Sequence, residues 1–293
     1  MLPALLIGYN RPNHAARVLE SMRSAGVREL LVALDGPRPG DKKSCSQTRK
    51  IVEAVEWPES LEIRVSDHNQ GPGWGPRNAI EWFLDQHAVG IICEDDTLLA
   101  SDAARFLTLA SEDFRQDVPM ASATSFGCSA YKGRSDYFAS RYATTWGWAV
   151  SADAWSNYDY LMADWPKRRS SGWLAAVGGS RNFSEYWTNI FDMTYADRDH
   201  YWDYQWQYAM WRQGWNCWHP RVNLATNIGF DAAATHTRST RRGLTSLPAG
   251  KLRDLVVRPD STTCDHKVDG WIDRHVYETR RSIKGRMYRA IFG

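Results

Sequence analysis

The amino-acid sequence lacks the features that define several protein classes. Its 293 residues contain no uninterrupted apolar run of about 18 residues, so no membrane-spanning helix is expected. Only a short apolar run precedes Asn10, without a cationic leader, so a secretory signal is not expected either. These absences predict a cytoplasmic protein.

Cysteine and net charge are also scarce. The five cysteines are scattered without Cys-X-X-Cys spacing, which argues against a disulfide framework and against a zinc site. A formal net charge of +2 is too small to indicate a polyanion-binding protein, and no nucleic-acid reading motif is present. We therefore expect a reducing compartment and no nucleic-acid partner.

Tryptophan, in contrast, is abundant: the chain has 15, most of them between Trp146 and Trp218. Indole rings fill cores and interfaces, and their flat faces also stack on the apolar faces of sugar rings. Tryptophan content does not decide between these roles, but it raises the expectation of a carbohydrate ligand.

The first third of the chain alternates short apolar runs with helical patterns. This alternation is typical of βαβ units around a parallel sheet. A glycine-rich turn at 69–75 precedes a helix predicted at 76–86. Ligands bind outside the carboxyl ends of the strands in open α/β sheets, so a site is expected there. The predicted strands lie at 4–9, 29–34, 61–66 and 90–93.

The rest of the chain is less periodic. We expect one catalytic domain over 1–237, followed by a basic loop and a helical extension over 238–293. The last helix, at 271–292, is basic and amphipathic, so it either lies on an anionic membrane surface or packs on the domain. Before it, the patterns predict a loop at 165–182, helices at 183–195 and 203–212, and a strand at 222–228.

Three consecutive carboxylates, Glu94, Asp95 and Asp96, follow the fourth predicted strand. Like charges held close together raise one another's pKa values, and a bound divalent cation removes this cost. Mg²⁺ and Mn²⁺ can bind one or two carboxylates together with substrate phosphates. A solvated acidic turn is the alternative, but the position at a strand's carboxyl end favours a ligand site.

Polar residues follow two other predicted strands. Arg11, in Tyr9-Asn10-Arg11-Pro12, has the guanidinium geometry that binds phosphate through two hydrogen bonds. Asp35 could accept hydrogen bonds from a base or a ribose, although an Asp before Gly-Pro is usually a turn residue. Their placement at successive strand ends favours one shared site.

Several short motifs follow one another between residues 4 and 237. They are Tyr9-Asn10-Arg11-Pro12, Ala33-Leu34-Asp35-Gly36, Asn69-Gln70-Gly71 with Arg77-Asn78, Glu94-Asp95-Asp96, Trp146-Gly147-Trp148-Ala149, Trp202-Asp203-Tyr204-Gln205-Trp206 and Asn227-Ile228-Gly229-Phe230. In this order they resemble GT-A-fold glycosyltransferases, in particular bacterial family-2-like nucleotide-diphospho-sugar transferases. The acidic triplet is also similar to that of N-acetylglucosaminyltransferase I.

The resemblance implies a Rossmann-like, mostly parallel central sheet flanked by helices, with a C-terminal helical extension. It implies an inverting hexosyl transfer from a nucleoside-diphosphate sugar, with a UDP-sugar expected. The implied acceptor is a glycan or lipid-linked glycan hydroxyl in bacterial surface polysaccharide synthesis, at the inner face of the cytoplasmic membrane. The implied donor contacts are Tyr9, Asn10, Arg11, Asp35, Arg77, Asn78, Glu94, Asp95 and Trp148.

The resemblance also implies a catalytic base and a metal site. Asp203 matches the position of the family's base, which takes the proton of the acceptor hydroxyl. The alternative is that Asp203 only caps the following helix, which would lower its pKa. Asp96 and His236 are the implied ligands of Mn²⁺ or Mg²⁺, since a C-terminal histidine often completes the coordination in GT-A enzymes and imidazole suits Mn²⁺. The family's usual motif is Asp-X-Asp, and Glu94 stands at its first position.

Two other functions compete with this one. A sugar-nucleotide pyrophosphorylase shares the nucleotide site at the strand ends, but it normally carries a longer glycine-rich, cationic loop after the first strand. A non-catalytic sugar-binding module would share the aromatic richness. Release of nucleotide from a donor distinguishes an enzyme from such a module.

Overall fold

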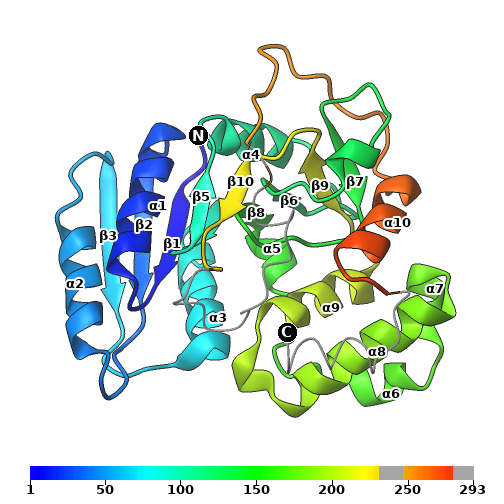
Figure 1. Cartoon of the computed structure of the whole chain (residues 1–293), viewed down its shortest axis with the longest axis horizontal. Helices are drawn as coiled ribbons and strands as arrows, with labels where there is room; N and C mark the ends of the chain where they lie inside the picture. Colours follow the sequence, from blue (N-terminus) through cyan, green and yellow to red (C-terminus); the bar gives the residue numbers. More distant parts are fainter. Residues whose placement is uncertain (231–246, 248, 280–293) are drawn as a thin grey trace.

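The computed structural model describes residues 1–230, 247 and 249–279. A mixed sheet of eight strands forms the centre of this described part, with helices on its faces (Figure 1). A separate two-stranded sheet pairs β5 with β10. The strands are β1 (Ala4–Gly8), β2 (Glu29–Leu34), β3 (Ser60–Val65), β4 (Val89–Glu94), β5 (Thr97–Leu99), β6 (Met120–Ser122), β7 (Tyr137–Ser140), β8 (Trp148–Ser151), β9 (Cys217–Pro220) and β10 (Ala225–Asn227).

The helices cover the sheet and build a second, helical region beside it (Figure 1). They are α1 (Pro12–Ser24), α2 (Lys42–Glu53), α3 (Gly71–Leu84), α4 (Ala103–Ser111), α5 (Ala152–Trp155), α6 (Trp165–Arg169), α7 (Trp173–Gly178), α8 (Arg181–Ala196), α9 (Asp203–Gln213) and α10 (His266–His275), with short 3₁₀ turns η1 (Cys128–Ala130) and η2 (Arg198–His200).

The large sheet runs in the order β3-β2-β1-β4-β8-β6-β9-β7. The neighbours from β3 to β4 are all parallel, so their carboxyl ends meet at one edge as predicted. Beyond β4 the sheet is mixed: β8 is antiparallel to β4 and β6, β7 is antiparallel to β9, and only β6 and β9 are parallel. The α/β fold class with a central sheet flanked by helices is confirmed, and parallel pairing predominates only in its first half.

The first strand shows why its residues form a central strand. Leu6 of β1 packs in a cluster with Val18 of α1, whereas Leu5 packs in another cluster with Phe83 of α3. Successive side chains of a strand point to opposite faces, so a strand covered by helices on both faces must be apolar throughout. Leu5 and Leu6 are fully buried, and the continuous apolar run in the sequence follows from this.

Most of the tryptophans serve the core. Trp165 and Trp187 lie in an aromatic cluster built by α6, α8 and α9, and both are almost fully buried. Val268 and Ile272 of α10 are buried in the same cluster. The described C-terminal helix therefore packs on the rest of the chain. It spans His266–His275, so it begins and ends earlier than predicted, and the part of the predicted helix at 280–292 lies outside the described residues.

Three predicted segments differ from the structure in type or extent. The segment 165–182 was expected as a loop but holds α6 and α7, because Trp165 and Leu174 bury their side chains in the aromatic cluster. The helix expected from Pro76 begins at Gly71, for a reason given below. The strand expected at 222–228 is shorter, and the basic loop at 238–250 lies mostly outside the described residues.

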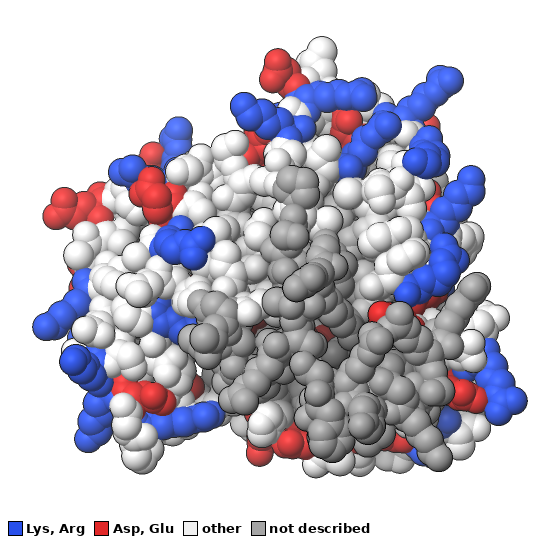
Figure 2. All heavy atoms as spheres, viewed as in Figure 1, with Lys and Arg blue, Asp and Glu red and all other residues white. Residues whose placement is uncertain are grey.

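Hydropathy and surface charge can be described for part of the chain. No described helix is long and apolar enough to cross a membrane. On the face shown in Figure 2, Lys and Arg side chains lie around the rim with Asp and Glu among them. The visible cations therefore do not gather into one continuous basic surface.

Candidate active site

A cleft of about 560 Å³ opens at the carboxyl ends of β1, β2, β3 and β4. The loops after these strands line it, together with the first turns of α3 and part of η2. The cleft has the size of small-molecule sites, typically about 300–1,000 Å³. It collects eight of the residues predicted for donor or metal binding: Tyr9, Asn10, Arg11, Asp35, Asn78, Glu94, Asp95 and Asp96.

Asp35 lies in the cleft, but its carboxylate is already occupied. Its Oδ1 accepts the backbone N–H groups of Gly36 and Gln70, both at 2.8 Å. Its Oδ2 accepts Asn69 Nδ2 at 2.8 Å and the Gly71 N–H at 3.1 Å. A carboxylate has about four acceptor positions, and these bonds fill them. Asp35 thus organises the loop before α3, and its contact with a base or ribose stays a prediction.

The same carboxylate explains why α3 begins early. Glycines at 71, 73 and 75 predicted a turn, because glycine disfavours helix interiors. Asp35, from another strand, accepts the N–H groups of Gln70 and Gly71, which a helix leaves without partners inside itself. Pro72 stands in the first turn, where its missing N–H costs nothing. A cap supplied by tertiary structure is not visible in the local sequence.

The acidic triplet is tied to Arg11 and to β10. Arg11 Nη1 lies 2.8 Å from Asp96 Oδ2 and 3.4 Å from Asp95 Oδ1. Asp95 Oδ2 accepts the Tyr9 N–H at 3.1 Å, and Asp96 Oδ1 accepts Asn227 Nδ2 at 3.1 Å. The guanidinium that was predicted to bind phosphate is therefore paired with carboxylates in this structure.

Electrostatic repulsion within the triplet is only partly relieved. Burial, and then the charge of Asp96, raise the pKa of Asp95 to about 6, while Arg11 opposes the rise. Burial also raises the pKa of Glu94, as do the charges of Asp96, Asp203 and Asp95. The side chain of Glu94 makes no hydrogen bond within the described residues. Among the described residues, Arg11 is the one guanidinium paired with the triplet, so a further positive charge would stabilise these carboxylates.

The donor set suits a hard divalent cation, since all of its atoms are carboxylate oxygens. The three carboxylates do not converge tightly: among the described residues, only Cys264, His266 and Asp269 bring three ligand atoms within 4.8 Å of one another. One or two members of the triplet, with phosphate oxygens of a ligand, are therefore the arrangement that fits. His236 lies outside the described residues.

Three other predicted residues differ in their placement. Asn78 lines the cleft, but its amide is held by Gln70 Oε1 at 2.6 Å and by Arg77 Nη1 at 2.9 Å. Arg77 itself does not line the cleft and pairs with Glu81 along α3. Trp148 is fully buried in the core beside Trp202, so the structure does not bring it to the cleft. The sequence could not separate this core tryptophan from one that binds ligand.

Asp203 is the first residue of α9, and its Oδ1 accepts the Tyr204 N–H at 2.9 Å. The residue is exposed at the surface, but the surrounding protein still removes part of the water around its carboxylate. This desolvation raises the pKa of Asp203, and the hydrogen bond from the Tyr204 N–H opposes the rise. The helix position was expected to lower the pKa, but desolvation outweighs it. Asp203 does not line the cleft, although it is near enough to raise the pKa of Glu94.

Sequence reasoning missed the wall of the cleft formed by Trp74 and Asp199. The Trp74 indole N–H donates to Asp199 Oδ1 at 3.0 Å, and its ring lies 4.2 Å from that of Tyr160. Gly73 of α3 lies so close to Tyr160 and η2 that a Cβ at this position would be 2.3 Å from Tyr160 Oη and 2.7 Å from the Asp199 carbonyl oxygen. The hydrogen bond between Trp74 and Asp199 joins residues 125 positions apart in the sequence. The only local signal was a tryptophan inside a glycine-rich segment.

No protein-family model matches the sequence, and no curated protein matches it. Among solved structures, the chain is similar to a mannosyltransferase from Pyrobaculum calidifontis in complex with GDP-Man and Mn²⁺. Identity is 12%, the TM-score is 0.37, and the match covers 53% of this chain and 46% of that chain. The chain thus spans less than half the length of that protein.

A second similar structure is mouse xyloside xylosyltransferase 1 in its apo form. Identity is 11%, the TM-score is 0.35, and the match covers 71% of this chain and 80% of that chain. Both proteins are glycosyltransferases by name. At these identities and TM-scores, neither structure identifies what this chain does.

Proposed function

We propose that this chain is a metal-dependent glycosyltransferase that moves a hexosyl group from a nucleoside-diphosphate sugar to an acceptor hydroxyl. The observation that carries the proposal is the position of the acidic triplet. Glu94, Asp95 and Asp96 stand at the carboxyl end of β4 and line the cleft together with the first turns of α3. A cleft of this size, with acidic groups at one end, suits a nucleotide whose diphosphate binds through a cation.

The part of the cleft between β2 and α3 is proposed to hold the nucleoside. Ala33 and Leu34 supply apolar lining from β2, and Pro76 supplies it from α3. Ser66 and Arg64 add polar groups at the end of β3. Apolar walls with a few placed polar groups are the usual composition of a nucleotide-sized pocket. Following the sequence resemblance, the donor is proposed to be a UDP-sugar.

Glu94 and Asp96 are the proposed ligands of Mn²⁺ or Mg²⁺, with His236 completing the coordination. When bound, such a cation supplies positive charge to the leaving diphosphate. Arg11 is proposed to exchange its pairing with Asp96 for the diphosphate, which its guanidinium can hold through two hydrogen bonds. The exchange leaves the carboxylate free when the donor arrives.

Asp203 is proposed to act as the base of an inverting displacement. The acceptor oxygen attacks the anomeric carbon, the bond from that carbon to the diphosphate oxygen breaks, and Asp203 takes the hydroxyl proton. The raised pKa of Asp203 makes it a better proton acceptor than an ordinary aspartate. The electron pair of the broken bond stays on the nucleoside diphosphate.

The acceptor is proposed to be a glycan or lipid-linked glycan of bacterial surface polysaccharide. The reaction would then take place at the inner face of the cytoplasmic membrane, with the basic residues after Thr279 as a peripheral contact. This part of the proposal is supported by the sequence resemblance.

A panel of nucleotide sugars, tested by thermal shift with and without Mn²⁺, examines the proposal. A ligand that binds only the folded state raises its stability according to concentration and affinity, so the true donor should stand out and should require the metal. That donor should then release nucleoside diphosphate. Formation of a nucleotide sugar from nucleoside triphosphate and sugar 1-phosphate would instead show a pyrophosphorylase. Binding without release under every acceptor tested would indicate a sugar-binding module.

A further inference from the structure

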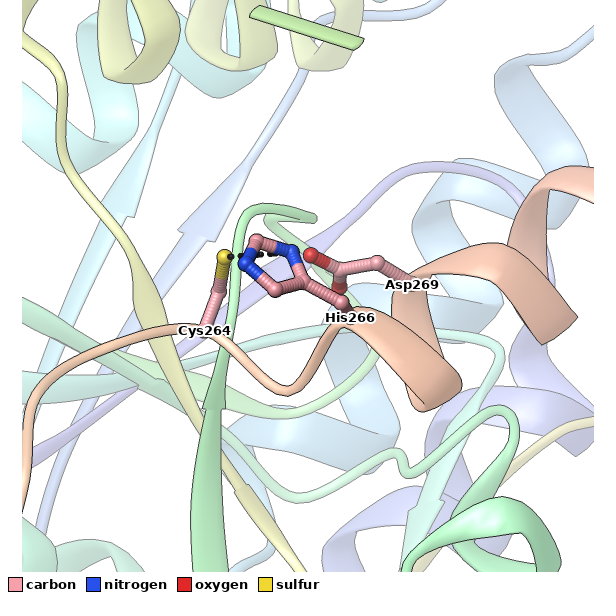
Figure 3. A group of neighbouring side chains, drawn as sticks. All are labelled: Cys264, His266 and Asp269. Carbon is pink, nitrogen blue, oxygen red and sulfur yellow. Dashed lines mark hydrogen bonds between the residues drawn. The ribbon is translucent and has the colours of Figure 1, made fainter. Parts of the chain in front are cut away.

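A second set of metal-binding side chains lies far from the cleft, where the chain enters α10. Cys264, His266 and Asp269 each offer a ligand atom, and these three atoms lie within 4.8 Å of one another. Figure 3 shows Cys264 in the loop before α10, His266 and Asp269 on its first turn, and the three side chains pointing toward a common centre. The group contains a single cysteine, so the spacing between cysteines in the sequence gave no sign of it.

The separation of the ligand atoms is close to what zinc requires. Cys264 Sγ lies 3.7 Å from His266 Nδ1. In a tetrahedral site with Zn–S of about 2.3 Å and Zn–N of about 2.0 Å, sulfur and nitrogen are separated by about 3.6 Å. These two atoms could therefore bind one ion without moving, and the carboxylate of Asp269, whose ligand atom lies within 4.8 Å of both, is the third ligand.

Asp269 provides an independent indication of a ligand. Its side chain is only 1% exposed, and its Oδ2 makes no hydrogen bond within the described structure. Ser140 Oγ occupies Oδ1 at 2.6 Å, and the nearest cation, Arg141, lies 4.0 Å from Oδ2 while bound to Asp273 at 2.6 Å. A buried carboxylate oxygen that accepts no hydrogen bond and has only a distant cation beside it is costly, and coordination to a metal would reduce that cost.

The backbone holds the three residues in place. Asp265 caps α10 by accepting the N–H groups of Lys267 and Val268, which fixes the first turn. His266 and Asp269 are three residues apart and so share one helix face. Asp265 also donates its N–H to the Ala139 carbonyl at 2.8 Å, which anchors the segment to β7. His266 is exposed, so an ion can enter from solvent.

We propose that Cys264, His266 and Asp269 bind one Zn²⁺, with water as the fourth ligand, and that this ion fixes the loop before α10 to the first turn of the helix. A cysteine with a histidine selects zinc over Mg²⁺ or Ca²⁺, which prefer oxygen ligands. The ion would link a loop residue to two helix residues, and through Asp269 and Ser140 it would reach the edge strand of the sheet. This site would be separate from the acidic triplet.

Co²⁺ absorbance tests the proposal, because a thiolate bound to cobalt gives a near-ultraviolet charge-transfer band that oxygen ligands do not give. The full chain, freed of metal by chelation, should develop this band with one equivalent of Co²⁺ and lose it when Zn²⁺ is added. Cys264→Ser should abolish the band. His266→Ala should weaken Co²⁺ binding by at least about tenfold, since even residues outside the ligand shell change affinity by that much.

Matched variants keep the test specific. Cys45→Ser alters a half-buried cysteine on α2, and His275→Ala alters the exposed histidine at the end of α10, so both should retain the band. Zn²⁺ should raise the melting temperature of the wild type and of His275→Ala, but not of His266→Ala. No band in the wild type, or an equal band in Cys264→Ser, would overturn the proposal. If Cys264→Ser does not fold, the exposed His266→Ala decides.

Discussion

Asp35, at the end of β2, accepts a hydrogen bond from the N–H of Gly71, the first residue of α3, at 3.1 Å. The helix that forms one wall of the cleft is thus positioned by a carboxylate from the strand end beside it. Loss of this side chain should displace the start of α3 and so change the shape of the site. Any effect on ligand affinity should follow from that change.

Asp35→Ala should therefore lower both stability and nucleotide affinity. Hydrogen bonds to a charged group are typically worth about 1.5–3 kcal/mol each, so the free energy of unfolding should fall by at least about 2 kcal/mol. Denaturant unfolding and titration calorimetry with a nucleoside diphosphate measure the two effects. Asp67→Ala, which alters an exposed aspartate in the same loop, is the control. Reduced affinity at unchanged stability would show that Asp35 contacts the ligand directly.

Glu94→Gln and Asp96→Asn should each abolish Mn²⁺-dependent donor binding while the protein stays folded. Glu94 has no hydrogen-bond partner to lose among the described residues, and Asn at position 96 keeps an oxygen that can accept from Asn227. Thermal shift with the donor and Mn²⁺ gives the measurement. Asp85→Asn, at an exposed position after α3, should behave as the wild type. Full wild-type activity in EDTA would remove the metal from the mechanism.

Asp203→Asn should lower kcat by about 10²–10⁴-fold, the usual contribution of a general base, and leave donor affinity almost unchanged. The wild-type kcat should rise with pH as the carboxylate loses its proton and then become level. Because the pKa of Asp203 is raised, the inflection should lie above about 3.9, the value of an ordinary aspartate. The variant should lack this inflection.

Asparagine is nearly as good as aspartate at satisfying a helix N-terminus. A variant at position 203 with wild-type kcat would therefore show that the residue has only a structural role. Asp199 would then be the next residue to test, because it lines the cleft.

Ile272→Ala should lower the free energy of unfolding by about 2–5 kcal/mol, because the side chain is 1% exposed in the aromatic cluster and a cavity would remain. Leu255→Ala removes the same kind of side chain where it is 88% exposed and should have almost no effect. Chemical denaturation compares the two. Equal effects would mean that α10 does not stabilise the chain through this contact.

The sequence was sufficient to predict the parallel half of the sheet and the position of the cleft. Leu5 and Leu6 face opposite covered sides, and such a strand must be continuously apolar, so the run itself identified β1. The acidic triplet was found because charge directly after a buried strand has few structural uses. Both signals are patterns among neighbouring residues, and such patterns can be recognised in the sequence without a structure.

What the sequence could not predict depends on contacts between distant residues. The helix start at Gly71 depends on Asp35, and the pairing of Arg11 with Asp96 depends on strands brought together by the sheet. Trp148 shows the converse, since a tryptophan in a motif can equally be core. The group around Cys264 was missed because its ligands are of three different residue types.

The close packing at Gly73 determines how the protein tolerates substitution at this position. No side chain fits between α3 and Tyr160, so any replacement must push η2 outward and carry Asp199 and the edge of the cleft with it. In a library of all single substitutions selected for activity, position 73 would look as intolerant as a catalytic position. Judged by mutational sensitivity alone, Gly73 would be taken for an active-site residue, although it is required only because it has no side chain.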